Sequence, residues 1–161
     1  MLVSQFSTEA GPASAAIRYL TIGDFSHVDL VVPEDIQVGT TLLKKGWLLG
    51  ARFHGGVQQR PPDYAKFTRT LRVGCVVPDL DAAYAFAVAQ LGKPYNSWAI
   101  LDFFLHKQRK FTPDQASWFC DELNYSIYAA GGLLLLDTED PLQLTPQEEL
   151  LSPYWKAVPT A

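Results

Sequence analysis

The feature that most constrains the fold is the order of two apolar patterns along the chain. Short β-branched or apolar runs with strand character come first, at residues 15–20, 27–32, 47–53 and 67–77. Apolar residues at helical spacing follow, from Asp79 or Asp81 to about Leu91, over 97–105, and from Trp118 to Ala130. Residues 133–137 predict one more short strand. This order predicts an α+β fold with a mostly antiparallel sheet packed against helices.

Turn and capping residues delimit these elements. The runs at 27–32 and 47–53 predict a hairpin with a long loop, because Pro33 ends the first run and a polar stretch joins it to the second. Asp79 or Asp81 can cap the following helix, which Gly92 ends. The segments 112–115 and 145–148 both have the capping-box pattern with proline at the first helical position, so the second one predicts a short last helix.

The composition describes one folded domain. The chain has 161 residues, 48% of them hydrophobic and 19% charged, which is enough apolar material for a sizeable core. We therefore expect a single domain over 1–161, with residues 1–14 as a flexible polar lead that contains glycine and proline.

Charge and hydropathy exclude several classes of partner. The net charge is -4, and lysine and arginine are scattered, so no nucleic acid is expected as a partner. The apolar stretches, such as 133–136, are far shorter than the ~20 residues of a membrane-spanning helix. The first residues do not form a secretory signal, so we expect a soluble protein that is cytoplasmic by default, with export or virion association left open.

The two cysteines, Cys75 and Cys120, are too few for a disulfide framework, and no cysteine or histidine spacing indicates a metal site. No cofactor is expected. Cys120 lies near the start of a helix that runs toward Gly131. A helix that begins at Ser117 would stabilise a thiolate at Cys120, whereas one that begins at Thr112 would do so much less. A lone cysteine is more often a small buried hydrophobe.

His27 is polar where an apolar strand begins. A general base that must contact a thiol needs such a rigid position, although a strand-end histidine can also be purely structural. Asp29 shares the strand face of His27 and could pair with it or with a substrate, or could be a solvated carboxylate.

Four segments together resemble one family. FSHVDLVV, LLGARFHGGV, LGKPY and SWFCDELNYSIYAAG are similar to the circularly permuted NlpC-type, papain-like cysteine peptidases and amidases, of which the YiiX-type proteins are one branch. The resemblance covers residues 15–132, and it implies a circularly permuted papain-like fold in which the histidine strand precedes the cysteine helix.

The resemblance implies roles for particular residues. Cys120 becomes the nucleophile, with its backbone N–H as a candidate oxyanion donor, and His27 becomes the general base. Asp121 replaces the usual serine after the cysteine.

The resemblance leaves the residue that orients the histidine open. Relatives often carry a polar residue just before an alanine on the second strand, but Gly50 stands at that position here. His54, two pleats farther along, is our candidate. Tyr95 and Trp118 are candidate walls of the substrate cleft, or alternatively core aromatics.

Two function classes follow. The first is a thiol hydrolase that cleaves an amide or ester bond of a peptide or acyl substrate through a thioacyl intermediate. Cell-wall peptides are the best-known substrates that the resemblance implies, and acyl transfer to lipid-linked substrates is open to the same dyad. The second is an inactive binding or assembly module, in a phage or prophage setting that the resemblance alone suggests. The glycine at position 50 is its main support.

Overall fold

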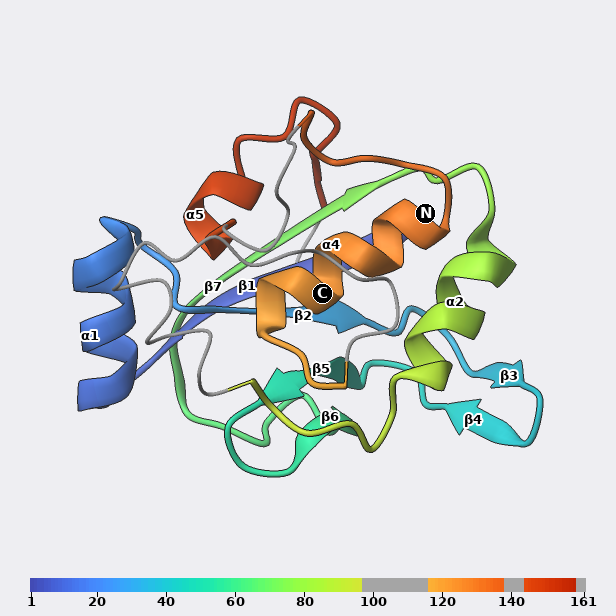
Figure 1. Ribbon diagram of the computed structural model, residues 1–161, viewed down its shortest axis with the longest axis horizontal. Helices are drawn as coiled ribbons and strands as arrows, with labels where there is room; N and C mark the ends of the chain where they lie inside the picture. Colours follow the sequence, from blue (N-terminus) through green and yellow to red (C-terminus); the bar gives the residue numbers. More distant parts are fainter. Residues whose placement is uncertain (97–115, 138–143, 159–161) are drawn as a thin grey trace.

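The fold is organised around a six-stranded antiparallel sheet with the strand order β6-β5-β2-β1-β7-β8. The computed structural model describes residues 1–96, 116–137 and 144–158. The elements are β1 (Leu2–Glu9), α1 (Pro12–Thr21), β2 (His27–Val31), β3 (Ile36–Val38), β4 (Thr41–Leu43), β5 (Leu48–Arg52), β6 (Gly56–Arg60), β7 (Phe67–Cys75), α2 (Leu80–Ala89), α4 (Cys120–Ala130), α5 (Pro146–Glu149) and β8 (Lys156–Ala157). Helix α4 crosses one face of the sheet, and α1 and α2 stand at its two ends (Figure 1).

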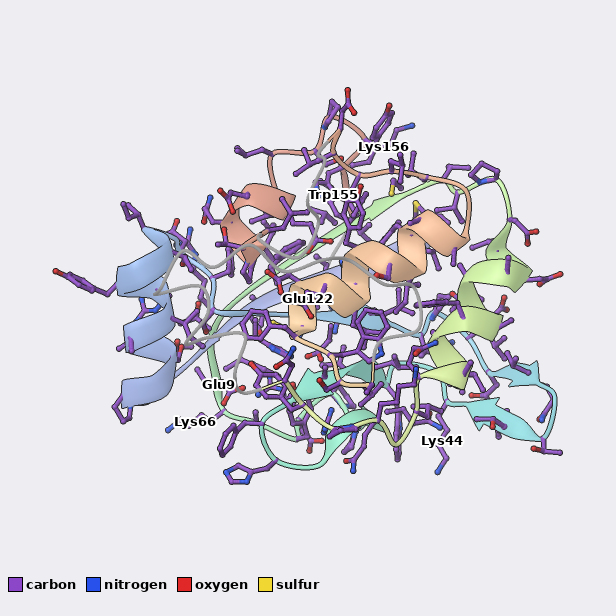
Figure 2. The ribbon with its side chains drawn as sticks, viewed as in Figure 1. Glu9, Lys44, Lys66, Glu122, Trp155 and Lys156 are labelled. Carbon is purple, nitrogen blue, oxygen red and sulfur yellow. The ribbon has the colours of Figure 1, made fainter. Side chains whose placement is uncertain are left out.

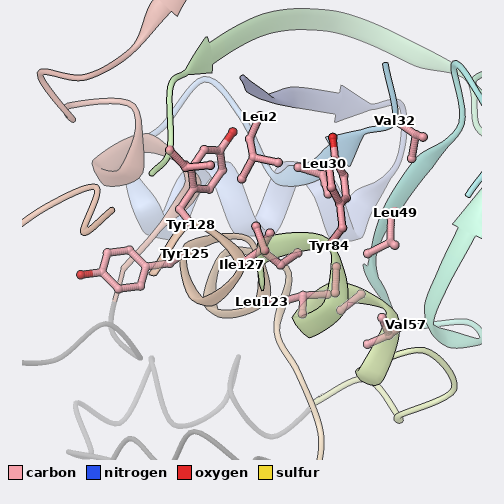
Figure 3. Packing of buried hydrophobic residues seen from close by; sticks show 14 of the residues in the cluster. Leu2, Leu30, Val32, Leu49, Val57, Tyr84, Leu123, Tyr125, Ile127 and Tyr128 are labelled. Carbon is pink, nitrogen blue, oxygen red and sulfur yellow. The ribbon is translucent and has the colours of Figure 1, made fainter. Parts of the chain in front are cut away.

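The main apolar core lies between α4 and the sheet. Leu123, Ile127 and Tyr128 of α4 belong to one buried cluster with Leu2 of β1 and Leu30 of β2 (Figure 3). Strand alternation accounts for this set, because Leu2, Leu30 and their apolar neighbours point to the same face of the sheet. The expected α+β class with an antiparallel sheet is thus what the structure has.

The N-terminal prediction was wrong. Residues 1–14 were expected to be a flexible lead, but Leu2–Glu9 is an inner strand that pairs with both β2 and β7. Its polar side chains made it look unlike a strand, yet Ser4 is fully buried and its Oγ donates to Asn124 Oδ1 at 2.9 Å. A buried hydroxyl with a hydrogen-bond partner is compatible with a central strand.

Two further strand predictions were also wrong. Residues 15–20 lie in α1, which has Pro12 in its first turn, a position where the missing N–H costs no hydrogen bond. Residues 133–137 form irregular structure with a bend at 135–136, and no strand. Leu135 is buried there while Leu134 is 60% exposed, so this leucine run is not buried as a unit.

The strand predictions at 27–32, 47–53 and 67–77 and the caps at Asp79 and Thr145 are confirmed. Strands β2 and β5 pair antiparallel, and the loop between them contains the β3–β4 hairpin. The Asp79 carboxylate caps α2 by accepting from the Ala82 N–H at 2.9 Å. Thr145 caps α5 in the expected box with Glu148.

The predicted helix over 97–105, the capping box at 112–115 and His106 lie outside the described residues. No helix within the described ranges has the length and apolarity needed to cross a membrane.

Candidate active site

Cys120 is the first residue of α4, so its thiol lies in the first turn of the helix. The first N–H groups of a helix have no partner within it, and Glu122 closes this end by accepting from the Phe119 N–H at 3.1 Å. The Cys120 N–H lies in this first turn. It can therefore donate to an oxyanion that forms beside its own sulfur.

A short backbone bridge fixes the start of α4. Tyr95 and Trp118 form an isolated parallel bridge, in which the Asn96 N–H donates to the Trp118 carbonyl at 2.9 Å and the Trp118 N–H donates to the Pro94 carbonyl at 3.1 Å. The LGKPY segment thus holds the start of α4 in place. The rings of Tyr95 and Phe119 pack with centroids 5.6 Å apart.

The Cys120 sulfur lies against the start of β2. The backbone N–H of Val28, the residue after His27, is a hydrogen-bond donor toward this sulfur and favours the thiolate. Burial and the neighbouring Asp121 carboxyl act in the opposite sense and raise the pKa of Cys120 well above its usual value. The side chain is 1% exposed. Cys120 is therefore a neutral thiol whose sulfur contacts the residue next to His27.

His27 is paired with Asp29 on the same strand. Nε2 of His27 lies 2.8 Å from Oδ1 of Asp29, and both side chains are buried. Burial lowers the pKa of His27, and the charge of Asp29 offsets this only in part. Burial alone would raise the pKa of Asp29, but His27, Arg52 and Tyr64 hold it below its usual range. Asp29 is thus ionised beside a neutral imidazole.

The tautomer of His27 follows from this pairing. An ionised carboxylate can only accept a hydrogen bond, so the proton of the neutral ring resides on Nε2. The lone pair is then on Nδ1, which makes no hydrogen bond within the described part of the chain. His27 is accordingly prepared to accept a proton at Nδ1.

Gly50 explains how Asp29 reaches this position. A Cβ atom built on Gly50 would collide with Oδ1 of Asp29. The carboxylate of β2 therefore occupies the space that any side chain at position 50 of β5 would need. The polar residue that the resemblance places at position 50 is absent, and an acid from the neighbouring strand occupies its space.

The structure places Asp29, not His54, on the ring of His27. His54 is exposed in the turn between β5 and β6, where its ring packs edge-on against Phe53 with centroids 5.0 Å apart. The glycines at 55 and 56 turn the chain here with φ of 90° and 65°, but the turn does not bring the His54 ring onto His27. His54 instead lines the cavity described below.

Two residues that the sequence did not indicate, Tyr64 and Arg52, contact Asp29. The Tyr64 hydroxyl donates to Oδ2 of Asp29 at 2.8 Å, and Nη2 of Arg52 lies 3.8 Å from the same oxygen. Arg52 also pairs with Glu9, and its guanidinium lies 4.4 Å from the centre of the Tyr64 ring. Strand alternation could have placed Arg52 on the face of Gly50, but Tyr64 lies in a proline-rich loop without periodicity.

A cavity of about 410 Å³ adjoins the base. His27, Arg52, Tyr64 and Tyr95 are among its lining residues, and Glu9 borders it beside α1 (Figure 2). Tyr95 thus stands where a cleft wall was expected. Trp118 does not line the cavity, since it is fully buried and its Nε1 donates to Gln90 Oε1 at 3.0 Å.

The Cys120 thiol and the His27 imidazole are not in contact. Val28 packs in the same buried cluster as Cys120, whereas alternation turns His27 and Asp29 toward the opposite face of β2. No hydrogen bond joins the Cys120 sulfur to the His27 ring among the described residues. Hydrogen bonds between catalytic groups often tighten only when substrate binds. A direct contact between the Cys120 sulfur and the His27 ring would therefore require a local rearrangement.

No cluster for a metal ion is present in the described ranges, since no three histidine, cysteine, aspartate or glutamate side chains are grouped so that they could hold one. Cys75 is buried in β7, away from these residues in sequence, and burial raises its pKa to about 11.

Comparison with known proteins identifies a shared fold. No protein-family model matches the chain, and no curated protein matches it significantly. Among solved structures, the chain is similar to the metalloprotein YiiX from Escherichia coli O157:H7, DUF1105, with a TM-score of 0.67 and 16% sequence identity. The match covers 99% of this chain and 96% of YiiX. The chain therefore has the YiiX fold over essentially its whole length.

Proposed function

We propose that the chain is a thiol hydrolase of the circularly permuted, papain-like type, which cleaves an amide or ester bond with Cys120 as nucleophile. The observation that carries the proposal is the His27–Asp29 pair, 2.8 Å apart, at the strand end where the Cys120 sulfur meets the Val28 N–H. The order of a histidine strand before a cysteine helix, and the shared YiiX fold, support this assignment.

The reaction begins from a neutral pair. Nδ1 of His27 takes the thiol proton as Cys120 Sγ attacks the substrate carbonyl carbon, and the carbonyl oxygen becomes an oxyanion beside the Cys120 N–H. Asp29 holds Nε2–H and stabilises the imidazolium that forms. His27 then gives the proton to the departing amine or alcohol. A water molecule, deprotonated by the same Nδ1, hydrolyses the thioacyl intermediate and regenerates the thiol.

Asp29 is the third member of this proposed triad. The sequence left its role open between pairing with His27 and binding substrate. Its contact with Nε2 and the space it takes above Gly50 support the orienting role. The missing polar residue at position 50 therefore no longer argues against catalysis. His54, on the cavity rim, is proposed as a substrate contact together with Tyr95.

A non-catalytic binding module is the second candidate, and one observation favours it. The Cys120 side chain is 1% exposed and makes no hydrogen bond to His27 among the described residues. A protein that keeps the fold for assembly would show this closed arrangement permanently, whereas a hydrolase must open it during turnover.

Hydrolysis assays separate the two candidates. Wall-derived peptides and p-nitrophenyl acyl esters are incubated with the wild type and with Cys120→Ser, and Cys75→Ser serves as the matched control. The hydrolase account expects turnover and a mass increase of the acyl group on Cys120, both lost in Cys120→Ser and retained in Cys75→Ser. Equal rates in the wild type and Cys120→Ser would refute the nucleophile. An added amine acceptor tests for acyl transfer in place of hydrolysis.

A further inference from the structure

The Asp29 carboxylate has a second anchor that the proposed triad does not include. Its Oδ1 is on His27, while its Oδ2 accepts from the Tyr64 hydroxyl at 2.8 Å. We propose that Tyr64 is a positioning residue: its hydroxyl holds the Asp29 carboxylate in the orientation in which Oδ1 stays on Nε2 of His27. The effect of Tyr64 on catalysis rests on the proposed function, whereas its effect on the orientation of Asp29 rests on the contacts alone.

The competitor for Asp29 is Arg52. Its Nη2 lies 3.8 Å from Oδ2, and neither Nε nor Nη2 has a hydrogen-bond partner in the part of the chain that the structure describes. A buried guanidinium with two unmade hydrogen bonds attracts any carboxylate that is free to turn. If Oδ2 were released, the carboxylate would rotate toward Arg52 and its other oxygen would leave His27.

The Tyr64 ring is held so that it can oppose this rotation. The Arg52 guanidinium lies 4.4 Å from the ring centre, and the Arg60 guanidinium lies 5.6 Å from it. The Phe67 ring packs edge-on with its centroid 5.5 Å away. These contacts fix the ring from several sides, so the hydroxyl has a defined direction toward Oδ2.

The charges around the pair are otherwise balanced. Glu9 from β1 pairs with Arg52 from β5, and Arg60 of β6 donates to the backbone carbonyls of Gly50 and Gly56. Burial, together with the nearby Asp29 charge, raises the pKa of Tyr64 well above its usual value, so the phenol remains a donor at every working pH. Tyr64 therefore acts on Asp29 as a hydrogen-bond donor and not as a charge.

The test is a double-mutant cycle read by NMR titration of the His27 ring. Tyr64→Phe removes one oxygen and leaves the ring to pack on Arg52 and Phe67. We expect it to lower the pKa of His27, since the carboxylate that favours the imidazolium moves away. In an Asp29→Asn background the same substitution should leave the pKa of His27 where Asp29→Asn alone puts it. Resonances are assigned with His54→Gln and His106→Gln.

The kinetic arm uses a p-nitrophenyl ester that the wild type hydrolyses. Tyr64→Phe should lower kcat about five- to tenfold with KM unchanged, as expected for the loss of one hydrogen bond to a charged group. Tyr19→Phe is the matched control, because Tyr19 is 84% exposed and the chemical change is the same. It should leave both the rate and the titration of His27 unchanged.

The results that overturn the inference are separate from those that overturn the function. A pKa of His27 that is unmoved or raised by Tyr64→Phe contradicts positioning, as does an equal shift in both backgrounds of the cycle. A wild type without Cys120-dependent turnover refutes the hydrolase, but the titration still decides whether Tyr64 orients the His27–Asp29 pair.

Discussion

At the scale of single residues, the candidate site depends on an acid on one strand that fills the space left by a glycine on the next strand. The acid on β2 occupies the space beside Gly50 on β5, so a glycine that first argued against catalysis is what makes room for Asp29. Such an arrangement cannot be predicted from spacing along the chain. It requires the pairing of β2 with β5, which only the fold supplies.

Gly50→Ala tests this arrangement. The new methyl group would collide with Oδ1 of Asp29 and force the carboxylate off His27. We expect ester hydrolysis to fall by about tenfold to a hundredfold, since small displacements of catalytic groups have effects of this order. Gly131→Ala is the control, because its Cβ would also be crowded, at 3.1 Å from Ala83 Cβ, but far from Asp29 in sequence and contacts. Full activity in Gly50→Ala would contradict the role of Asp29.

Burial raises the pKa of the Cys120 thiol most, and Asp121 is the second contribution. It is fully buried beside Cys120, and it stands where the resembling family has serine. Its carboxyl contributes to the raised pKa of Cys120. Asp121→Ser should therefore move the alkylation profile of Cys120 to lower pH, measured as the rate of iodoacetamide labelling between pH 6 and pH 10. Asp121→Asn should move it in the same direction. An unmoved profile in both variants would show that burial alone determines the acidity of the thiol.

At the scale of elements, the short helix α5 is attached to α4 through a buried acid. Glu149 Oε1 accepts from Asn124 Nδ2 at 2.6 Å, and burial raises the pKa of Glu149 to about 8. In the unfolded chain the same group ionises near 4.5. Between these pH values Glu149 is ionised in the unfolded chain but protonated in the folded one. The free energy of unfolding therefore decreases as the pH rises from about 4.5 to about 8.

Glu149→Gln tests this linkage. Glutamine keeps an oxygen that can accept from Asn124 and has no charge to bury. At pH 8 the variant should exceed the wild type in free energy of unfolding by roughly 3 to 5 kcal/mol, and at pH 4 the two should be equal. Urea titrations at a series of pH values measure the difference. Glu34→Gln, at an exposed position, is the control. A difference that does not depend on pH would contradict the buried-acid account.

Most strands with a regular apolar pattern were predictable from the sequence, but the apolar runs at 15–20 and 133–137 are not strands and the polar strand β1 was missed. β2, β5 and β7 coincide with β-branched and apolar runs. The N-cap at Asp79 and the capping box at Thr145 formed as expected. β1 was missed because Ser4, Gln5 and Ser7 are buried polar residues within a central strand. The sequence indicated Cys120 and His27 as candidate site residues. The contacts of Tyr64 and Arg52 with Asp29 could be found only from the fold, which brings these distant segments together.

At the scale of the whole molecule, the position of β1 makes the N-terminal residues essential. β1 contacts β2 on one side and β7 on the other, so the sheet is continuous only through it. We expect deletion of residues 1–9 to abolish cooperative thermal unfolding. Deletion of residues 156–161, which removes the edge strand β8, should leave a single transition, as expected for one domain. A cooperative transition in the N-terminal deletion would contradict the central role of β1.

The central claim is that His27 activates Cys120, and the alkylation rate of Cys120 at neutral pH tests it most directly. Labelling with iodoacetamide is followed by peptide mass spectrometry, with the buried Cys75 of the same molecule as internal reference. We expect Cys120 to be labelled faster than Cys75, and His27→Ala to lower only the Cys120 rate. Labelling of Cys120 no faster than Cys75, or at the same rate in His27→Ala, would contradict this claim.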